Sequence, residues 1–445
     1  MVHKAANEPD RARDRPDLSA GTGGVPKWRT LLRAGLPIGD QGLVAAFNLG
    51  LQLTLIRFAT QEDYGLFVLW QAIVMIVVTF QEASVGVPLS VRISFNADNP
   101  RRFVLERQLA GFSALVVATA AVVGFVAVFV TAPASASQML PFAVALYAAA
   151  FVTYAATRFL ALSRMAFAVA LLIDGVYTCL SLMALFALYV ASGSIALAPL
   201  FAMLSLPLLV AAGCGLLVLP RTPAVRIRGV VRSYRSIWRD SRWTALAALS
   251  TEVQNRAYVF ILTAIYGPAV MAGVFAGLLL MRHINVLTMA WTSFARPQMA
   301  KLRDEGAYRA LTVFVGASVV AFTGLYVVNL GVLALVWPLV ESYVYADKFE
   351  GMWPVVVLWT IISIAQMPIY PLSVALVVLG RYRDDCAAVV AGACVTLTAV
   401  ILLGLLVGPL AAVSGSIAGF VISVAIMAVK LRQELLARFA AATSA

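Results

Sequence analysis

The chain has 445 residues, of which 62% are hydrophobic and 12% charged, and a formal net charge of +12. Apolar runs of about twenty residues recur along it, and a helix of that length crosses a bilayer core of about 30 Å. The composition therefore excludes a soluble globular protein and predicts an all-α polytopic membrane protein. We interpret the positive charge as an orientation signal and an attraction to anionic lipid headgroups, so no nucleic-acid partner is expected.

Residues 1–28 are polar and rich in charge, Pro and Gly. Because no apolar stretch precedes the first span, this segment is expected to be a disordered cytoplasmic tail rather than a secretory signal peptide. Its glycines at 21–24 are followed by no phosphate-binding Lys, so they do not form a Walker loop. We therefore expect no ATP hydrolysis and no cofactor, and any energy that the chain uses must come from gradients.

Twelve apolar runs follow in two groups of six, with a basic linker at 220–242 between them and a cytoplasmic tail at 431–445 after them. The N-terminal six-helix lobe, 29–219, has predicted spans at 31–58, 64–91, 108–131, 139–160, 166–190 and 196–219. The C-terminal six-helix lobe, 243–430, has predicted spans at 243–266, 270–294, 310–337, 353–379, 386–406 and 409–429.

Basic residues are distributed unevenly between the connections. Twenty-nine of the 33 Lys and Arg residues lie at the termini, at span ends or in even-numbered connections, and Lys348 is the one that falls in an odd-numbered connection. Basic residues mark the cytoplasmic side of membrane proteins. The pattern predicts that both termini are cytoplasmic and that the odd-numbered connections face outward.

The two halves also share a pattern that indicates duplication. Residues 57–67 align without gaps to 265–275, which pairs Gly65 with Gly273. Since each half has an even number of crossings, both have the same orientation, and a pseudo-two-fold axis along the membrane normal is expected to relate them. A cleft between the lobes follows from this arrangement.

The pattern of the linker at 220–242 predicts an amphipathic helix that lies in the plane of the inner leaflet and binds anionic phospholipid. The alternative is that this helix binds a partner or recruits a substrate. Its apolar residues at helical spacing are Ile227, Val230, Val231, Tyr234, Ile237 and Trp238. Its basic residues on another face are Arg228, Arg232, Arg235, Arg239 and Arg242.

Ionisable residues deep inside the spans are the candidate site. Each costs about 2.5 to 3.5 kcal/mol at mid-depth unless it meets water or a partner, so they are expected to line a polar cavity. The six candidates are Asp40, Glu82, Asp174, Glu252, Arg256 and Arg282. The carboxylates among them, with His283, are also candidates for proton or cation coupling.

Each candidate has a structural alternative. Glu252 and Arg256 are four residues apart and can form an ion pair that locks the seventh span. Asp174 can belong to a packing network with nearby Tyr177, and a lone His283 is often only a hydrogen-bonded helix residue. Arg282 has no acidic residue within helical reach on its own span, so its partner must be another helix, water or an anionic ligand.

Prolines interrupt two spans and are candidate hinges. Pro37 lies in the first span, and Pro368 and Pro371 lie in the tenth. Each removes a backbone hydrogen bond and favours a bend, which is either a gating hinge or a static kink. The four cysteines have no ligand-like spacing, so neither a metal site nor a disulfide framework is predicted.

Residues 55–67, together with Glu82-Ala-Ser-Val-Gly86, resemble the opening of bacterial polysaccharide flippases of the Wzx type, within the multidrug/oligosaccharidyl-lipid/polysaccharide exporter superfamily. The resemblance extends to Asn255-Arg256, the turn at 267–275 and Arg296-Pro297. The family usually has an acidic residue followed by Leu-Gly. This chain instead has Ala-Ser-Val-Gly after Glu82.

The resemblance implies two six-helix lobes around a central cavity, lined by spans one, two, seven and eight, that opens alternately to the two membrane faces. It implies flipping of an undecaprenyl-pyrophosphate-linked oligosaccharide from the inner to the outer leaflet of the bacterial cytoplasmic (inner) membrane for surface or exopolysaccharide synthesis. Cationic residues would meet the pyrophosphate or acidic sugars. A polysaccharide polymerase and export machinery are possible partners.

Two other functions stay open from the sequence. A cation-coupled drug or metabolite exporter of the same superfamily would have a narrower, mostly apolar cavity. A membrane-embedded polysaccharide polymerase or transferase would need a catalytic cluster in an outer loop. The longest predicted outer loop, 338–352, has four charged residues but neither His nor Arg, so an enzyme is not expected.

Overall fold

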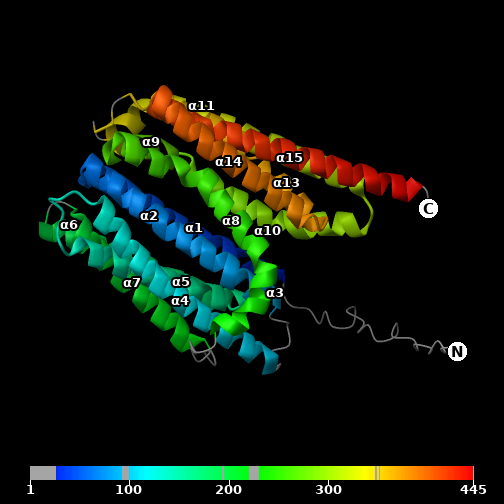
Figure 1. Ribbon diagram of the computed structural model, residues 1–445, viewed down its shortest axis with the longest axis horizontal. Coiled ribbons are helices and arrows are strands. Elements are labelled where there is room, and N and C mark those ends of the chain that lie inside the picture. Colours follow the sequence, from blue (N-terminus) through cyan, green and yellow to red (C-terminus); the bar gives the residue numbers. More distant parts are fainter. Residues whose placement is uncertain are drawn as a thin grey trace.

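A computed structural model describes residues 27–92, 100–192, 195–219, 230–345, 348–349 and 351–443, and within these ranges the regular structure is entirely helical (Figure 1). The N-terminal half comprises α1 (Lys27–Phe58), α2 (Gln61–Gln81), the π-helix η1 (Glu82–Gly86), α3 (Val87–Arg92), α4 (Pro100–Thr131), α5 (Leu140–Ser163), α6 (Phe167–Ser192) and α7 (Leu197–Val218). The C-terminal half comprises α8 (Val230–Tyr266), α9 (Pro268–Leu279), α10 (Arg282–Asp304), α11 (Tyr308–Val340), the π-helix η2 (Glu341–Tyr345), α12 (Trp353–Gln366), α13 (Ile369–Val378), α14 (Tyr382–Leu406) and α15 (Pro409–Thr443).

These helices form twelve rods that coincide with the predicted spans. Four rods are interrupted: α2 continues through η1 into α3, α9 into α10, α11 into η2, and α12 into α13. The first six rods pack as one lobe and the last six as another, lower and upper in Figure 1. The all-α, twelve-helix, two-lobe fold class is therefore confirmed.

Nine of the described helical segments are long and apolar enough by themselves to cross a membrane. Residues 42–58 and 268–279 are shorter apolar helices, and the rod formed by α8 carries charged residues within its apolar run. The rods outside the set of nine are α1, α8 and the α9–α10 pair, and each of them carries polar residues to the junction between the lobes.

Large apolar side chains cover the outside of the helices. Phe129, Leu217 and Leu335 are 74%, 87% and 84% exposed, respectively, and similar residues line α6 and α14. So much exposed apolar surface on long helices is unfavourable in water and is the normal state of a helix that faces lipid. The chain is a multi-pass membrane protein.

Close packing inside the C-terminal lobe depends on small residues. A Cβ on Gly415 of α15 would lie 2.8 Å from the Ala399 backbone of α14, so only glycine fits there. Gly419 is similarly confined by Gly392. Small residues let membrane helices approach closely, which strengthens their van der Waals contact.

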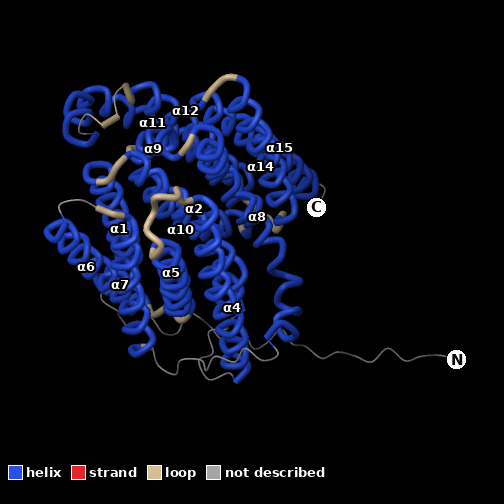
Figure 2. Tube along the Cα trace, turned by 60° about the vertical axis from the view of Figure 1, so that its left-hand side comes forward, coloured by secondary structure: helices blue, strands red, loops and turns tan. Residues whose placement is uncertain are grey.

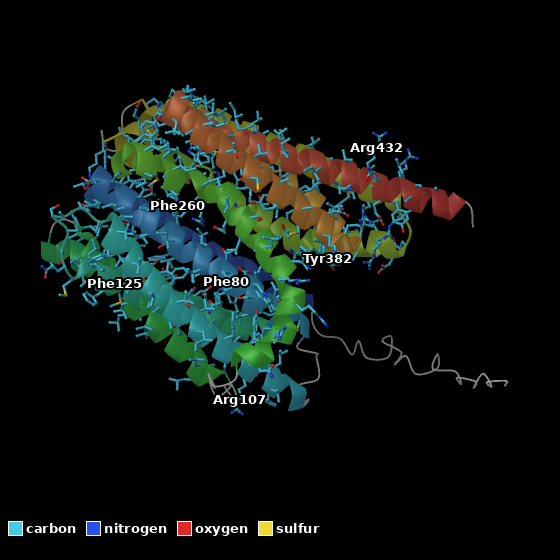
Figure 3. The ribbon with its side chains drawn as sticks, viewed as in Figure 1. Phe80, Arg107, Phe125, Phe260, Tyr382 and Arg432 are labelled. Carbon is cyan, nitrogen blue, oxygen red and sulfur yellow. The ribbon has the colours of Figure 1, made fainter. Side chains whose placement is uncertain are left out.

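The two ends of the molecule differ in charge. Arg107 and Arg432 lie toward the same end, whereas Phe125 and Phe260 lie toward the other (Figure 3). We call the first the basic end, and we call the second the turn end because it carries the α1–α2 turn at 59–60 and the α8–α9 turn at Gly267. This separation of charge matches the alternation that the sequence predicts.

The linker differs from the prediction. Its described part, from Val230, is continuous with the seventh span as one 37-residue helix, α8. The side chains of Tyr234 and Ile237 are buried, and the Tyr234 ring stacks on Phe112 of α4 with centroids 3.9 Å apart. The expectation of a separate in-plane helix is wrong for this part, because its apolar face packs on the N-terminal lobe instead of lipid. Residues 220–229 lie outside the described ranges, as does the predicted tail up to residue 26.

The predicted C-terminal tail is largely helical. The segment predicted as a cytoplasmic tail at 431–445 continues α15 as far as Thr443. Leu431 and Leu435 are buried against the C-terminal lobe, and Glu434 accepts a hydrogen bond from Arg438 Nε at 2.7 Å. These contacts explain why the helix does not end at the predicted end of the twelfth span.

Candidate substrate cavity

A cavity of about 640 Å³ lies between the two lobes. One wall comes from α1 and α2, and the facing wall from α8, α9 and α10, with further residues of α12, α13 and α15. Spans one, two, seven and eight thus supply most of the wall, as the resemblance implies. In the view of Figure 2 the helices of the two halves that contribute these walls, among them α1, α2 and α10, run alongside one another.

Amide side chains give the wall most of its polar character, and charge-based reasoning from the sequence missed them. The six are Asn48, Gln52, Gln71, Gln254, Asn255 and Gln366. A signal was present, since Asn48, Gln52, Gln71 and Gln366 each interrupt a largely apolar run, and polar side chains inside a membrane usually face the bundle interior.

Several of the amides are held by protein partners. Gln366 Nε2 donates to Asn255 Oδ1 at 2.9 Å, which joins α12 to α8. The Tyr147 hydroxyl donates to Gln71 Oε1 at 2.8 Å. These hydrogen bonds fix the orientation of the side chains, so part of the polar wall is organised before any ligand enters.

Arg282 brings a positive charge to the cavity wall. It is the first residue of α10, directly after the break between α9 and α10, and its side chain is half-buried. The guanidinium carbon lies 4.9 Å from the centroid of the Phe275 ring, a cation–π arrangement. Among the carboxylates whose side chains the structure describes, a set that does not include Asp40, none forms an ion pair with Arg282, and its own span offers no such partner.

Arg256 also lines the cavity, but its charge is compensated. Its Nε donates to Glu252 Oε2 one helical turn earlier, and both side chains are largely buried. The predicted ion pair is confirmed. Glu252 therefore acts on the cavity through Arg256 and does not itself form part of the wall.

The other predicted site residues are dispersed. His283 lies on the wall next to Arg282, whereas Glu82 has an exposed side chain at the start of η1 and is not among the wall residues. Asp40 belongs to α1, and its side chain lies outside the described part of the structure.

Asp174 has a structural position instead of a place on the cavity wall. Its side chain is completely buried in the N-terminal lobe, where Arg158 Nε lies 2.8 Å from Oδ2 and the Tyr154 hydroxyl donates to Oδ1. A carboxylate deep in the lobe needs such partners because its desolvation is costly. The packing alternative, with Tyr154 and Arg158 as partners, describes this residue better than a cavity role.

The candidate hinges differ in their local structure. Pro37 lies in α1, which is helical from Lys27 to Phe58, so the backbone shows no break there. Pro368 lies at the junction between α12 and α13, and Pro371 lies in the first turn of α13. The tenth span is therefore interrupted where its prolines predict a bend, while hinge motion remains a prediction for all three.

Contacts between the lobes close the turn end above the cavity. Lys348 Nζ donates to the backbone oxygens of Arg57 and Ala59, at 2.6 and 2.9 Å, which caps the last carbonyls of α1. Gln61 Nε2 in turn donates to the Lys348 carbonyl. Gly65 of α2 touches the backbone of Pro268, so any larger residue would overlap α9. We call these contacts the turn-end seal.

The turn-end seal is not symmetric, although it involves the duplicated segments. Gly65 faces Pro268. The alignment of the two halves pairs Gly65 with Gly273 and Pro268 with Thr60, so a symmetric seal would place Gly273 against Thr60. Gly273, however, faces Phe349, and a Cβ added at Gly273 would lie 3.6 Å from the Phe349 ring. The segment that holds Lys348 and Phe349 thus occupies the place that a strict repeat would give to the α1–α2 turn.

The fold and the cavity define a class of protein: a twelve-helix, two-lobe membrane protein with a cavity between the lobes. Solved structures with this fold include an inward-facing multidrug resistance MATE family transporter of the MOP superfamily, with a TM-score of 0.66 and 14% identity over 89% of this chain and 95% of that chain. They also include the lipid II flippase MurJ in an inward closed conformation, with a TM-score of 0.65 and 11% identity over 91% and 89%.

A third similar structure is a MOP superfamily transporter from Pyrococcus furiosus, with a TM-score of 0.62 and 11% identity over 92% of this chain and 96% of that chain. No protein-family model and no curated protein matches the sequence. At these identities the likeness establishes the fold alone. The same fold serves a drug transporter and a lipid II flippase, so the substrate must be argued from the cavity.

Proposed function

We propose that the protein is an alternating-access flippase that moves an undecaprenyl-pyrophosphate-linked oligosaccharide from the inner to the outer leaflet of the bacterial cytoplasmic membrane. The observation that carries the proposal is Arg282, a half-buried cation on the wall of an amide-rich cavity, with no ion-pair partner among the carboxylates whose side chains are described. A guanidinium pairs with phosphate through two parallel hydrogen bonds, and this pairing strengthens away from bulk water.

The remainder of the wall suits a glycan. Amide groups both donate and accept hydrogen bonds, as sugar hydroxyls do, and the aromatic rings of Trp359 and Tyr370 offer flat faces beside them. The cavity volume of about 640 Å³ is in the range of small-molecule sites. A cavity of this size holds a few sugar units while the polyprenyl tail stays in the bilayer. The amide side chains and Arg282 on this wall support a hydrophilic, anionic cargo.

A drug exporter is the second candidate, because it shares the fold. The described wall of this cavity has Arg256 and Arg282 but no Asp or Glu, an arrangement that repels organic cations. Glu252 neutralises Arg256, so the residual charge is positive. This electrostatic balance favours an anionic lipid-linked cargo over a cationic drug. A membrane-embedded transferase is less well supported, because the similar structures are transporters.

Orientation and coupling are parts of the same proposal. The basic end faces the cytoplasm, where anionic phospholipid and the lipid-linked substrate meet it, and the turn end faces outward. Asp40, Glu82, Glu252 and His283 remain candidates for proton or cation coupling, and the polysaccharide polymerase and export machinery are the proposed recipients of the cargo.

The test uses cells whose surface glycan depends on this protein. Arg282→Ala is expected to reduce surface glycan by about tenfold or more, and Arg282→Lys less, because Lys keeps the charge but loses the planar fork. Arg309→Ala changes an exposed basic residue outside the cavity and is the matched control. Export at the normal level by Arg282→Ala, with normal amounts of inserted protein, would refute the proposed role of Arg282.

A further inference from the structure

We infer that Gln52 of α1 and Ser416 of α15 form a subsite that hydrogen-bonds neutral donor groups of the glycan, separate from the phosphate-binding role of Arg282. The inference rests on the proposed function and names the residues that form hydrogen bonds with the sugar. The two residues come from opposite lobes and both lie on the cavity wall.

The evidence is a pair of buried oxygens without partners. Gln52 is 5% exposed and Ser416 2%, and neither Gln52 Oε1 nor Ser416 Oγ has a hydrogen-bond partner among the residues that the structure describes. Buried polar atoms are nearly always paired, because an unpaired one keeps its desolvation cost. Other unpaired oxygens of the described chain, such as Gln81 Oε1, do not belong to this wall.

The remaining amides of the wall do not share this property. Gln366 and Asn255 bond to each other, and Gln254 Nε2 donates to Ser423 Oγ at 2.9 Å. Their hydrogen bonds hold the wall in shape. Gln52 Oε1 and Ser416 Oγ have no such bond, and because both atoms are buried from solvent, their side chains must turn toward the cavity to meet a group that enters it.

The chemistry of these atoms restricts what that group can be. Gln52 Oε1 can only accept, so its partner must carry an N–H or O–H; an ionised phosphate has none to give. A cationic ammonium would supply donors, but the positive charge of Arg282 on the same wall disfavours it. A neutral hydroxyl or acetamido N–H meets both conditions. Ser416 Oγ can donate or accept, so it suits the hydroxyls of a sugar as well.

The experiment compares two probes on the purified full-length protein. One is undecaprenyl pyrophosphate, and the other is the glycosylated undecaprenyl pyrophosphate isolated from membranes of the source cells when export is blocked. The wild-type protein is expected to bind the glycosylated probe more tightly. Gln52→Met and Ser416→Ala should each weaken binding of the glycosylated probe about fivefold, the effect of one lost neutral hydrogen bond, and leave binding of the bare probe unchanged.

The possible outcomes distinguish failure of the proposed function from failure of the proposed subsite. If wild type binds neither probe, the proposed function fails. If wild type binds both probes and the two variants bind the glycosylated probe as wild type does, the function survives and the subsite is refuted. An equal loss for both probes would also refute the subsite, because the residues would then affect the cavity as a whole.

Control variants address folding. Ser414→Ala removes a hydroxyl of α15 that bonds to Ala411 O and is not part of the wall, and Gln81→Met removes a buried amide elsewhere. Both should keep the affinity of wild type for both probes. Ligand-free Gln52→Met and Ser416→Ala should unfold at or above the wild-type temperature, because each removes an unpaired buried oxygen. A lower unfolding temperature with unchanged affinity would show that the two oxygens are structural.

Discussion

At the scale of single residues, burial decides what each charge does. Asp174 and Arg158 form an ion pair inside the N-terminal lobe, Glu252 and Arg256 form one beside the cavity, and Arg282 has an aromatic ring instead of a carboxylate next to it. A buried pair is costly to break, because the remaining partner is left as an uncompensated charge. Of these charges, Arg282 is therefore the one positioned to gain strongly from an anionic ligand.

Asp174→Asn should destabilise the protein by about 3 kcal/mol or more, because Arg158 would lose its counter-charge inside the lobe. Asp304→Asn is the matched control, since its pair with Arg303 is exposed and such pairs contribute about 1 kcal/mol or less. Denaturant unfolding of both variants in the same detergent measures the difference. Equal stability of the two would show that the Asp174 pair contributes no more than a surface pair.

A second residue-scale prediction concerns the pair at the cavity. Arg256→Met and Glu252→Gln should each lower the unfolding temperature, and the double variant should lower it by less than the sum, because neither charge is then left alone. A thermal unfolding series of the four proteins gives the interaction directly. Strict additivity would mean that the two groups are compensated by other partners.

The sequence could predict the depth of these charges and the Glu252–Arg256 pair, because both follow from spacing along one helix. It could not predict that Asp174 meets Arg158, which lies on a different helix and is reached only after the lobe folds. The amide groups on the wall were missed for a related reason: an amide such as Gln52 carries no charge, and its significance depends on what surrounds it.

At the scale of helices, interruptions in the rods have identifiable causes. Pro88 has no N–H to give to the Ser84 carbonyl, and the preceding residues form the π-helix η1, in which the Val87 amide bonds to Glu82 O. The Tyr234 hydroxyl of α8 donates to the Ser84 carbonyl at 2.5 Å. A side chain from the other half thus supplies the donor that proline removed.

Tyr234→Phe should therefore cost about 1 to 1.5 kcal/mol of stability in the natural chain, the net value of one buried hydrogen bond. In a Pro88→Ala background the cost should be much smaller, since the restored amide can bond to Ser84 O. Unfolding of the four members of this double-mutant cycle provides the measurement. A cost that is the same in both backgrounds would contradict this account of η1.

Hydrophobic runs could predict the number of rods and most of their bounds, and Pro368 could predict the break between α12 and α13. They could not predict that α8 begins in the linker, because an amphipathic helix has the same sequence pattern whether its apolar face meets lipid or Phe112. Tertiary contact, which the local pattern does not encode, decides between the two.

At the scale of the whole molecule, the turn-end seal separates the cavity from the surroundings at the turn end. Lys348 holds the end of α1, and Gly65 permits the close approach of α2 and α9. Both sets of contacts join the N-terminal lobe to the C-terminal lobe. They must break before the chamber can open at the turn end.

Lys348→Met should shift the population toward forms open at the turn end, because two hydrogen bonds between the lobes are lost; a change of about 1.4 kcal/mol alters the ratio tenfold. A cysteine placed at Asn48, in a chain whose own cysteines are replaced, reports the change through labelling by a membrane-impermeant maleimide added outside cells. The variant should label several-fold faster than its parent. Arg57→Met, which removes a weaker contact with Tyr343 O, should have a smaller effect. Equal labelling of all three chains would contradict the role of the turn-end seal.

The unbroken course of α8 has a mechanical consequence. Its first turns are held by Ser84 and Phe112 of one half, and its far end, Tyr266, belongs to the other. With a rise of about 1.5 Å per residue, the distance from Tyr234 to Tyr266 is roughly 48 Å. A tilt of about 10° at the anchored end would swing the opposite end of a rod of that length by about 8 Å. A small rearrangement near Tyr234, at the basic end, is thus amplified along α8 into a displacement of several ångströms at the turn end.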